Sequence, residues 1–167
     1  DASIDPLMAA RLCRLLARAA GAAGMAGGQA IDLANVGSSM DRSGLEHMHR
    51  CKTGALLQAS VMMGAVTGDC NAQALHGLRE YGDALGLAFQ VVDDILDVTT
   101  DSATLGKTAG KDAAADKPTF VSLMGLDAAQ ACADGLLAQA HAALRQSGLR
   151  NTQHLHALAD WVGQRAS

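Results

Sequence analysis

The chain has 167 residues and a formal net charge of -4; 49% of its residues are hydrophobic, 2% are aromatic and 2 are prolines. The shortage of aromatic residues disfavours a β-sheet and predicts an all-α protein, long enough to bury a substantial core. The net negative charge argues against nucleic-acid binding. The sequence has no apolar run long enough to predict a transmembrane helix. The four cysteines are widely spaced, which indicates reduced thiols in the cytoplasm.

The Asp5-Pro6 pair predicts the start of the first helix, because proline is favoured at the first helical position. Apolar residues recur at helical spacing beyond it. Four glycines lie between positions 21 and 28. If the helix continues to Leu33, these poor helix formers indicate close packing or the close approach of a ligand.

A turn-rich segment, residues 35–44, predicts a loop before the second helix. Ser43, with Glu46 three residues later, predicts a capping box, and the helix is expected to end near Gly68. Within it, the tripeptide Lys52-Thr53-Gly54 places a cation and a hydroxyl beside bare backbone. Such a group can bind a phosphate; the alternative is a surface lysine before a tolerated helical glycine.

Residues 72–99 form the longest periodic segment and predict a helix with one buried face and one acidic face. Asp93, Asp94 and Asp97 fall within about 100° of arc, and Gln90 shares their face. Carboxylates this close repel by roughly 3 kcal/mol per pair, and no Lys or Arg stands three or four positions away. Mg²⁺ would neutralise them, because it joins carboxylates to substrate phosphates; a solvated acidic face is the alternative.

The segment after this helix carries lysines within reach of its acidic end. We expect a loop that folds Lys107 and Lys117 over a metal-bound anion and closes the site against water. The segment does not match the Walker phosphate-binding pattern. Lysines that are simply solvated are the alternative explanation.

Three further helices are expected in the last third of the chain. The first is short, from Thr119 to Leu126; the second is capped by Asp127 and ends near Arg145. The last is capped by Asn151 or Thr152. No linker long enough to separate domains interrupts them, so we predict a single domain over the whole chain.

Five segments together resemble the trans-prenyltransferases of the isoprenoid synthase family, most closely the bacterial farnesyl diphosphate synthases. The segments, in family order and at family spacing, are 27–33, 49–56, 86–97, 105–107 with 116–120, and 158–161. The resemblance implies the C-terminal half of an all-α isoprenoid synthase bundle. It also implies head-to-tail condensation of dimethylallyl or geranyl diphosphate with isopentenyl diphosphate to farnesyl diphosphate, with Mg²⁺ as cofactor.

The resemblance assigns a role to each candidate site residue. The metal ligands are Asp93, Asp94 and Asp97. The catalytic residues are Lys52, Thr53 and Gln90. The substrate-binding residues are Lys52, Thr53 and Gln90 together with Gln29, Asp32, Lys107 and Lys117, and Arg165 corresponds to a cationic end near isopentenyl diphosphate. A cytoplasmic homodimer that binds neither membrane nor nucleic acid is expected.

The sequence departs from the family pattern in one respect. The family carries another D-D-x-x-D motif, followed by an Arg pair, on an earlier helix, and the present sequence begins downstream of that motif. Either that half precedes the present sequence or the chain is a half-protein that needs a partner. Three alternatives stay open: a geranyl, geranylgeranyl or longer-chain diphosphate synthase of the same fold, a non-catalytic helical subunit of a heteromeric prenyl synthase, and an unrelated interaction bundle with an acidic patch.

Overall fold

A computed structural model describes residues 4–99 and 117–165, and within those ranges every regular element is helical. The elements in chain order are α1 (Pro6–Ala20), α2 (Met25–Ala34), α3 (Arg42–His49), the π-helical turn η1 (Arg50–Gly54), α4 (Ala55–Thr67), α5 (Ala72–Thr99), α8 (Phe120–Met124), α9 (Leu126–Gln146) and α10 (Gln153–Gln164). The predicted all-α fold is confirmed. None of the helices in the described ranges is long and apolar enough to cross a membrane.

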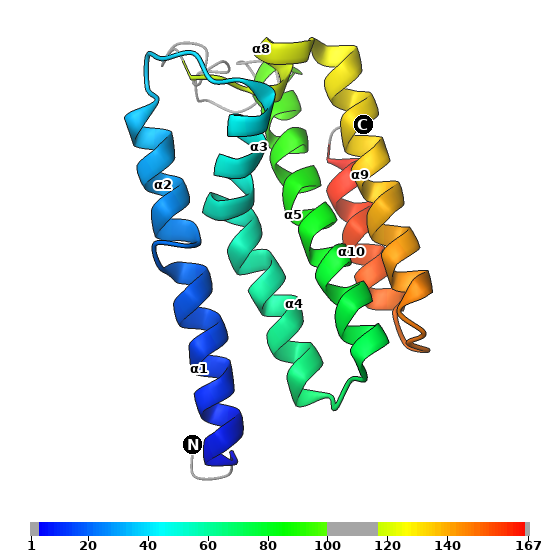
Figure 1. Cartoon of the computed structure of the whole chain (residues 1–167). Coiled ribbons are helices and arrows are strands. Elements are labelled where there is room, and N and C mark those ends of the chain that lie inside the picture. The colour runs from blue at the N-terminus through cyan, green and yellow to red at the C-terminus, as the bar shows by residue number, and fades with distance from the viewer. Residues whose placement is uncertain (1–3, 100–116, 166–167) are drawn as a thin grey trace.

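Helix α5 is the centre of the bundle, between α4 on one side and α9 on the other (Figure 1). Its bounds are those predicted from the sequence. The prediction of a single buried face was incomplete. Apolar residues such as Val91 are buried as expected, but Gly82 and Gly86, on the side predicted to be acidic, are also buried, against α4 and η1. The Tyr81 hydroxyl donates a hydrogen bond to the Leu155 carbonyl at 2.8 Å and fixes α10 to α5.

The turn η1 lies between α2 and α5, and glycines make both contacts possible. A Cβ on Gly28 would lie 2.2 Å from the Lys52 backbone nitrogen, and a Cβ on Gly86 would lie 2.8 Å from the Gly54 Cα. Any larger residue would push the helices apart. The C-terminal ends of α2 and α5 and the whole of α8 lie at one end of the bundle (Figure 1).

The first helix does not continue to Leu33. Helix α1 ends at Ala20 and α2 begins at Met25, with Gly21 and Gly24 in the break. A Cβ on Gly24 would lie 2.1 Å from the Ala19 carbonyl oxygen, so the bend needs glycine there. The glycine run therefore serves a change of chain direction as well as close packing.

Two of the predicted helix caps are wrong. Helix α3 begins at Arg42, and Asp41, rather than Ser43, is its cap; Asp41 accepts a hydrogen bond from the Gly44 N–H at 2.7 Å. The start of α9 is set by Gly125 at a φ of 83°, which places Asp127 inside the first turn. The short helix expected from Thr119 to Leu126 is α8, which ends at Met124; the Thr119 side chain caps its start and forms a capping box with Ser122.

Candidate functional site

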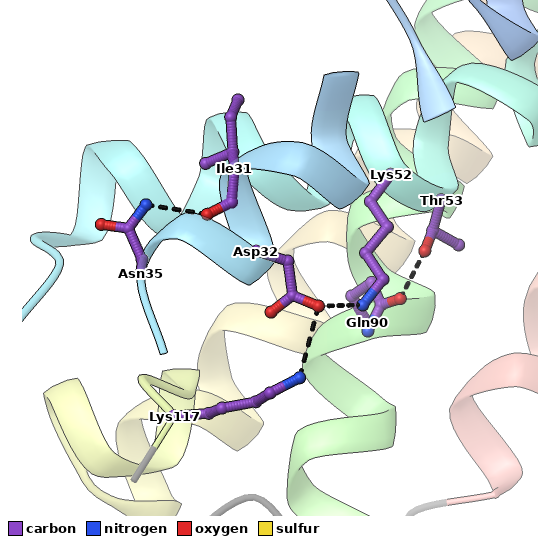
Figure 2. A network of polar contacts seen from close by, with 7 residues as sticks. All are labelled: Ile31, Asp32, Asn35, Lys52, Thr53, Gln90 and Lys117. Atoms are coloured by element: carbon purple, nitrogen blue, oxygen red, sulfur yellow. Dashed lines mark hydrogen bonds and ion pairs between the residues drawn. The ribbon is translucent and has the colours of Figure 1, made fainter. Parts of the chain in front are cut away.

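The turn η1 presents Lys52 and Thr53 to helices on either side (Figure 2). The Lys52 Nζ donates to the Asp32 Oδ2 of α2 at 2.6 Å. The Thr53 hydroxyl donates to the Gln90 Oε1 of α5 at 2.6 Å. Single π-helical turns inside α-helices occur often at functional sites, and here the turn directs two neighbouring side chains to different helices.

A second lysine joins the same carboxylate. The Lys117 Nζ donates to the Asp32 Oδ2 at 3.3 Å, and only 8% of Asp32 is exposed. Burial alone would raise the pKa of Asp32, but hydrogen bonds and charges from Lys52 and Lys117 outweigh burial and lower it. The three charged groups carry one net positive charge between them. Gln29 lies half-buried on α2, three residues before Asp32.

The three aspartates near the end of α5 lie in different surroundings. Asp94 is 5% exposed, and its carboxylate accepts a hydrogen bond from the Phe120 N–H at 2.7 Å. The Asp93 side chain is 54% exposed, and Asp97 is half-buried. The expected common acidic face is therefore only partly formed, because Asp94, at one end of its arc, is covered by α8.

The described ranges contain no group of three or more His, Cys, Asp or Glu side chains close enough to hold a metal ion by themselves. Asp93 and Asp97 nevertheless share a face, because residues four apart lie one above the other on a helix. Mg²⁺ usually keeps several waters and takes one or two carboxylates together with substrate phosphates. The donor chemistry of Asp93 and Asp97 fits that mode of binding, with Asp94 packed beside them.

Arg165, just after α10, contacts the acidic end of α5. Its Nη2 donates to the Asp93 Oδ1 at 3.4 Å, and its Cζ lies 4.9 Å from the Phe89 ring centre and 5.7 Å from that of Trp161. Such stacking stabilises a cation. The resemblance associated Arg165 with isopentenyl diphosphate, but the sequence gave no signal that Asp93 is its partner, because the two lie 72 residues apart.

His49 is a buried residue of the site region to which the sequence assigned no role. It is 7% exposed and stacks on the Phe120 ring at 5.7 Å. Neither ring nitrogen has a hydrogen-bond partner in the part of the chain that the structure describes. Burial, with a contribution from the Lys52 charge, lowers the pKa of His49 to about 4, so the ring is neutral at physiological pH.

The structure brings five predicted site residues together around η1 in what we call the network: an Asp32–Lys52–Lys117 group and, beside it, a Thr53–Gln90 pair (Figure 2). Gln90 lies about one helical turn before Asp93 and two before Asp97, which relates these contacts to the aspartates. The predicted diphosphate contact at Lys107 falls outside the described residues.

Comparison with known proteins identifies the family. Residues 4–157 match the family described as "Polyprenyl synthetase". The chain is 47% identical over 153 residues to farnesyl diphosphate synthase of Escherichia coli (strain K12), covering 90% of this chain and 51% of that protein. It is 41% identical over 168 residues to geranylgeranyl pyrophosphate synthase 7, chloroplastic, of Arabidopsis thaliana, covering 98% of this chain and 48% of that protein.

The fold agrees with a solved structure. The geranyltransferase of Helicobacter pylori, complexed with magnesium and isoprenyl diphosphate, matches with a TM-score of 0.80 at 31% identity, over 97% of this chain and 53% of that one. The chain spans about half the length of the curated relatives it matches. From the match over residues 4–157 and the identity to these relatives, the chain belongs to the polyprenyl synthetase family.

Proposed function

We propose that the protein condenses dimethylallyl or geranyl diphosphate with isopentenyl diphosphate, head to tail, to give farnesyl diphosphate. The observation that carries the proposal is the network around η1. It places two lysines beside a hydroxyl–amide pair, and Gln90 of that pair lies about one helical turn before Asp93 and two before Asp97. The 47% identity to a farnesyl diphosphate synthase supports the product assignment.

Asp93 and Asp97 would hold Mg²⁺, with Asp94 beside them, and bound Mg²⁺ would neutralise charge on the leaving diphosphate. Lys52 and Lys117 add fixed positive charge where negative charge develops. The resemblance assigns the same role to Lys107. Mg²⁺ dependence is part of the proposal and is supported by the magnesium in the Helicobacter pylori relative.

The reaction begins when the allylic C–O bond breaks and its electron pair leaves with diphosphate. Thr53 and Gln90 present oxygen atoms that steady the positive charge on the allylic carbon. The double bond of isopentenyl diphosphate then forms a bond to that carbon. A proton is lost to the diphosphate, which balances the charge.

A geranylgeranyl product is the second candidate, because the chain is 41% identical to a geranylgeranyl pyrophosphate synthase. A subunit of a heteromeric prenyl synthase is the third candidate for the function of this chain. The chain is 40% identical to the heterodimeric geranylgeranyl pyrophosphate synthase large subunit 1, chloroplastic, of Arabidopsis thaliana. Our preferred assembly is a cytoplasmic homodimer.

The test is a product assay with labelled isopentenyl diphosphate and each allylic diphosphate in the presence of Mg²⁺. We expect a 15-carbon product by mass spectrometry. Lys52→Ala should lower kcat/KM about 100-fold, while Asp134→Asn, a change at an exposed position on α9, should leave it unchanged. A 20-carbon product would favour the second candidate, and the absence of any condensation would overturn the proposal.

A further inference from the structure

One carboxylate oxygen serves two ammonium groups at the centre of the network (Figure 2). Asp32 Oδ2 accepts from Lys52 at 2.6 Å and from Lys117 at 3.3 Å. The two lysines come from η1 and from the segment before α8, and lie 20 and 85 residues from Asp32 in the sequence. Three separate parts of the chain therefore meet at a single atom.

The backbone around Asp32 places this short side chain against η1. Gly28, four residues earlier on the same face of α2, allows α2 to touch the backbone of η1. Asn35 closes the end of α2 by donating its side-chain amide to the Ile31 carbonyl at 2.8 Å (Figure 2). Asp32 is thus held on a short, capped helix end that lies directly against the turn carrying Lys52.

The charges explain why a carboxylate stands there. Two ammonium groups within hydrogen-bond reach of one oxygen are close enough to repel strongly in a partly buried site. Asp32 offsets that repulsion, and the lowered pKa of Asp32 keeps its carboxylate charged. Its presence also means that an incoming diphosphate meets one net positive charge instead of two.

We propose that Asp32 is a positioning residue that acts through Lys52 and Lys117: its carboxylate holds the two ammonium groups side by side and competes with diphosphate for them. The proposal rests on the proposed function, which assigns diphosphate binding to the same two lysines. In place of the cavity-lining contact implied by resemblance, Asp32 does not touch the substrate. It keeps the lysines aligned before diphosphate binds, and its ion pairs with them form again when pyrophosphate leaves.

The test measures the affinity of inorganic pyrophosphate for the purified protein by calorimetry at low ionic strength without Mg²⁺. Asp32→Asn removes the competing charge and should tighten binding about tenfold, a gain that shrinks as salt is added. Asp134→Asn, which removes an exposed carboxylate on α9, should leave the affinity unchanged. Damage to the fold would weaken binding, so a gain in affinity separates competition from a merely structural role.

A double-mutant cycle shows whether Asp32 acts through the lysines. In the Lys52→Met/Lys117→Met background, Asp32→Asn should no longer change pyrophosphate affinity. In turnover assays, Asp32→Asn should lower both kcat and KM about tenfold, because lysines without the competing carboxylate bind diphosphate more tightly and release it more slowly. A carboxylate that contacted substrate directly would keep its effect in the double-lysine background.

Asp32→Glu provides a second variant should Asp32→Asn fail to fold. It retains the charge but displaces it, so pyrophosphate affinity should stay within about twofold while kcat falls, because the alignment of the lysines is lost. The proposal is overturned if Asp32→Asn weakens pyrophosphate binding or leaves it unchanged, or if Asp32→Glu leaves kcat intact. Failure of the wild-type protein to bind pyrophosphate would instead remove the diphosphate site of the proposed function itself.

Discussion

The Thr53 hydroxyl donates to the Gln90 Oε1 across 2.6 Å, and this hydrogen bond joins the π-helical turn η1 to the central helix α5. The two backbones approach closely enough because Gly86, one helical turn before Gln90, has no Cβ, which would lie 2.8 Å from the Cα of Gly54. The bond fixes the orientation of both side chains. Gln90 lies three residues before Asp93, so the bond relates Lys52 of η1 to the aspartates of α5.

Thr53→Val should lower kcat about tenfold, because it removes the donor to Gln90 and leaves that half-buried amide oxygen unpaired. Thr53→Ser retains the hydroxyl and should recover most of the activity. Steady-state kinetics of both variants make the comparison, with circular dichroism as the check on folding. Equal losses in Thr53→Val and Thr53→Ser would show that the hydroxyl is not the important group.

Gly28→Ala should destabilise the protein by at least about 2 kcal/mol, because a Cβ at this position would lie 2.2 Å from the Lys52 backbone nitrogen. The matched control is Gly135→Ala in α9, where a Cβ meets nothing within 4 Å. That change should stabilise the helix by up to about 1 kcal/mol. Urea unfolding measures both, and equal effects at the two positions would contradict the close contact of α2 with η1.

Asp94→Ala should cost about 2 kcal/mol of unfolding free energy, because it leaves the Phe120 N–H without this buried acceptor. Asp93→Ala should cost less than about 1 kcal/mol, because its side chain is 54% exposed and its contact with Arg165 is 3.4 Å long. Chemical denaturation of the two variants tests the separation of roles. A larger stability loss for Asp93→Ala would reverse the assignment.

Acid should destabilise the protein through His49. The folded-state pKa of His49 is lowered from 6.5 to about 4, so below pH 6.5 the unfolded chain takes up the proton first. The contribution of neutral His49 is complete above pH 6.5 and is lost as the pH falls toward 4, by at most about 3 kcal/mol.

His49→Phe keeps an aromatic ring against Phe120 and should flatten stability against pH over this window. His154→Gln, a change at an exposed position on α10, should leave the pH dependence as it is. Urea unfolding at half-unit pH steps gives the two curves. An unchanged slope in His49→Phe would show that another group titrates there.

Local patterns predicted those parts of the fold that depend on neighbouring residues. The period of apolar residues was enough for α5, and the short helix expected from Thr119 is present as α8. The break before α2 was not predicted, because it depends on the fit of Gly24 against the Ala19 carbonyl. The start of α3 was misassigned because Asp41 and Ser43 are both good caps and the preference between them is set by the path of the preceding loop.

The candidate site shows the same difference between what neighbouring residues predict and what tertiary contacts decide. The resemblance supplied the residue types, and the structure supplied their partners. The contacts of Asp32 with Lys52 and Lys117, and of Asp94 with Phe120, join residues at least 20 positions apart, which no local spacing rule connects. An arc of about 100° on an isolated helix says nothing of which neighbouring element covers one end of it.

The most direct measurement of the central claim, that the aspartates of α5 hold Mg²⁺ for the departure of diphosphate, is the Mg²⁺ dependence of kcat/KM in Asp93→Ala. We predict a fall of about 100-fold or more at low Mg²⁺, with partial recovery as Mg²⁺ is raised and with unfolding free energy close to wild type. A kcat/KM equal to that of the wild type at every Mg²⁺ concentration would contradict the account.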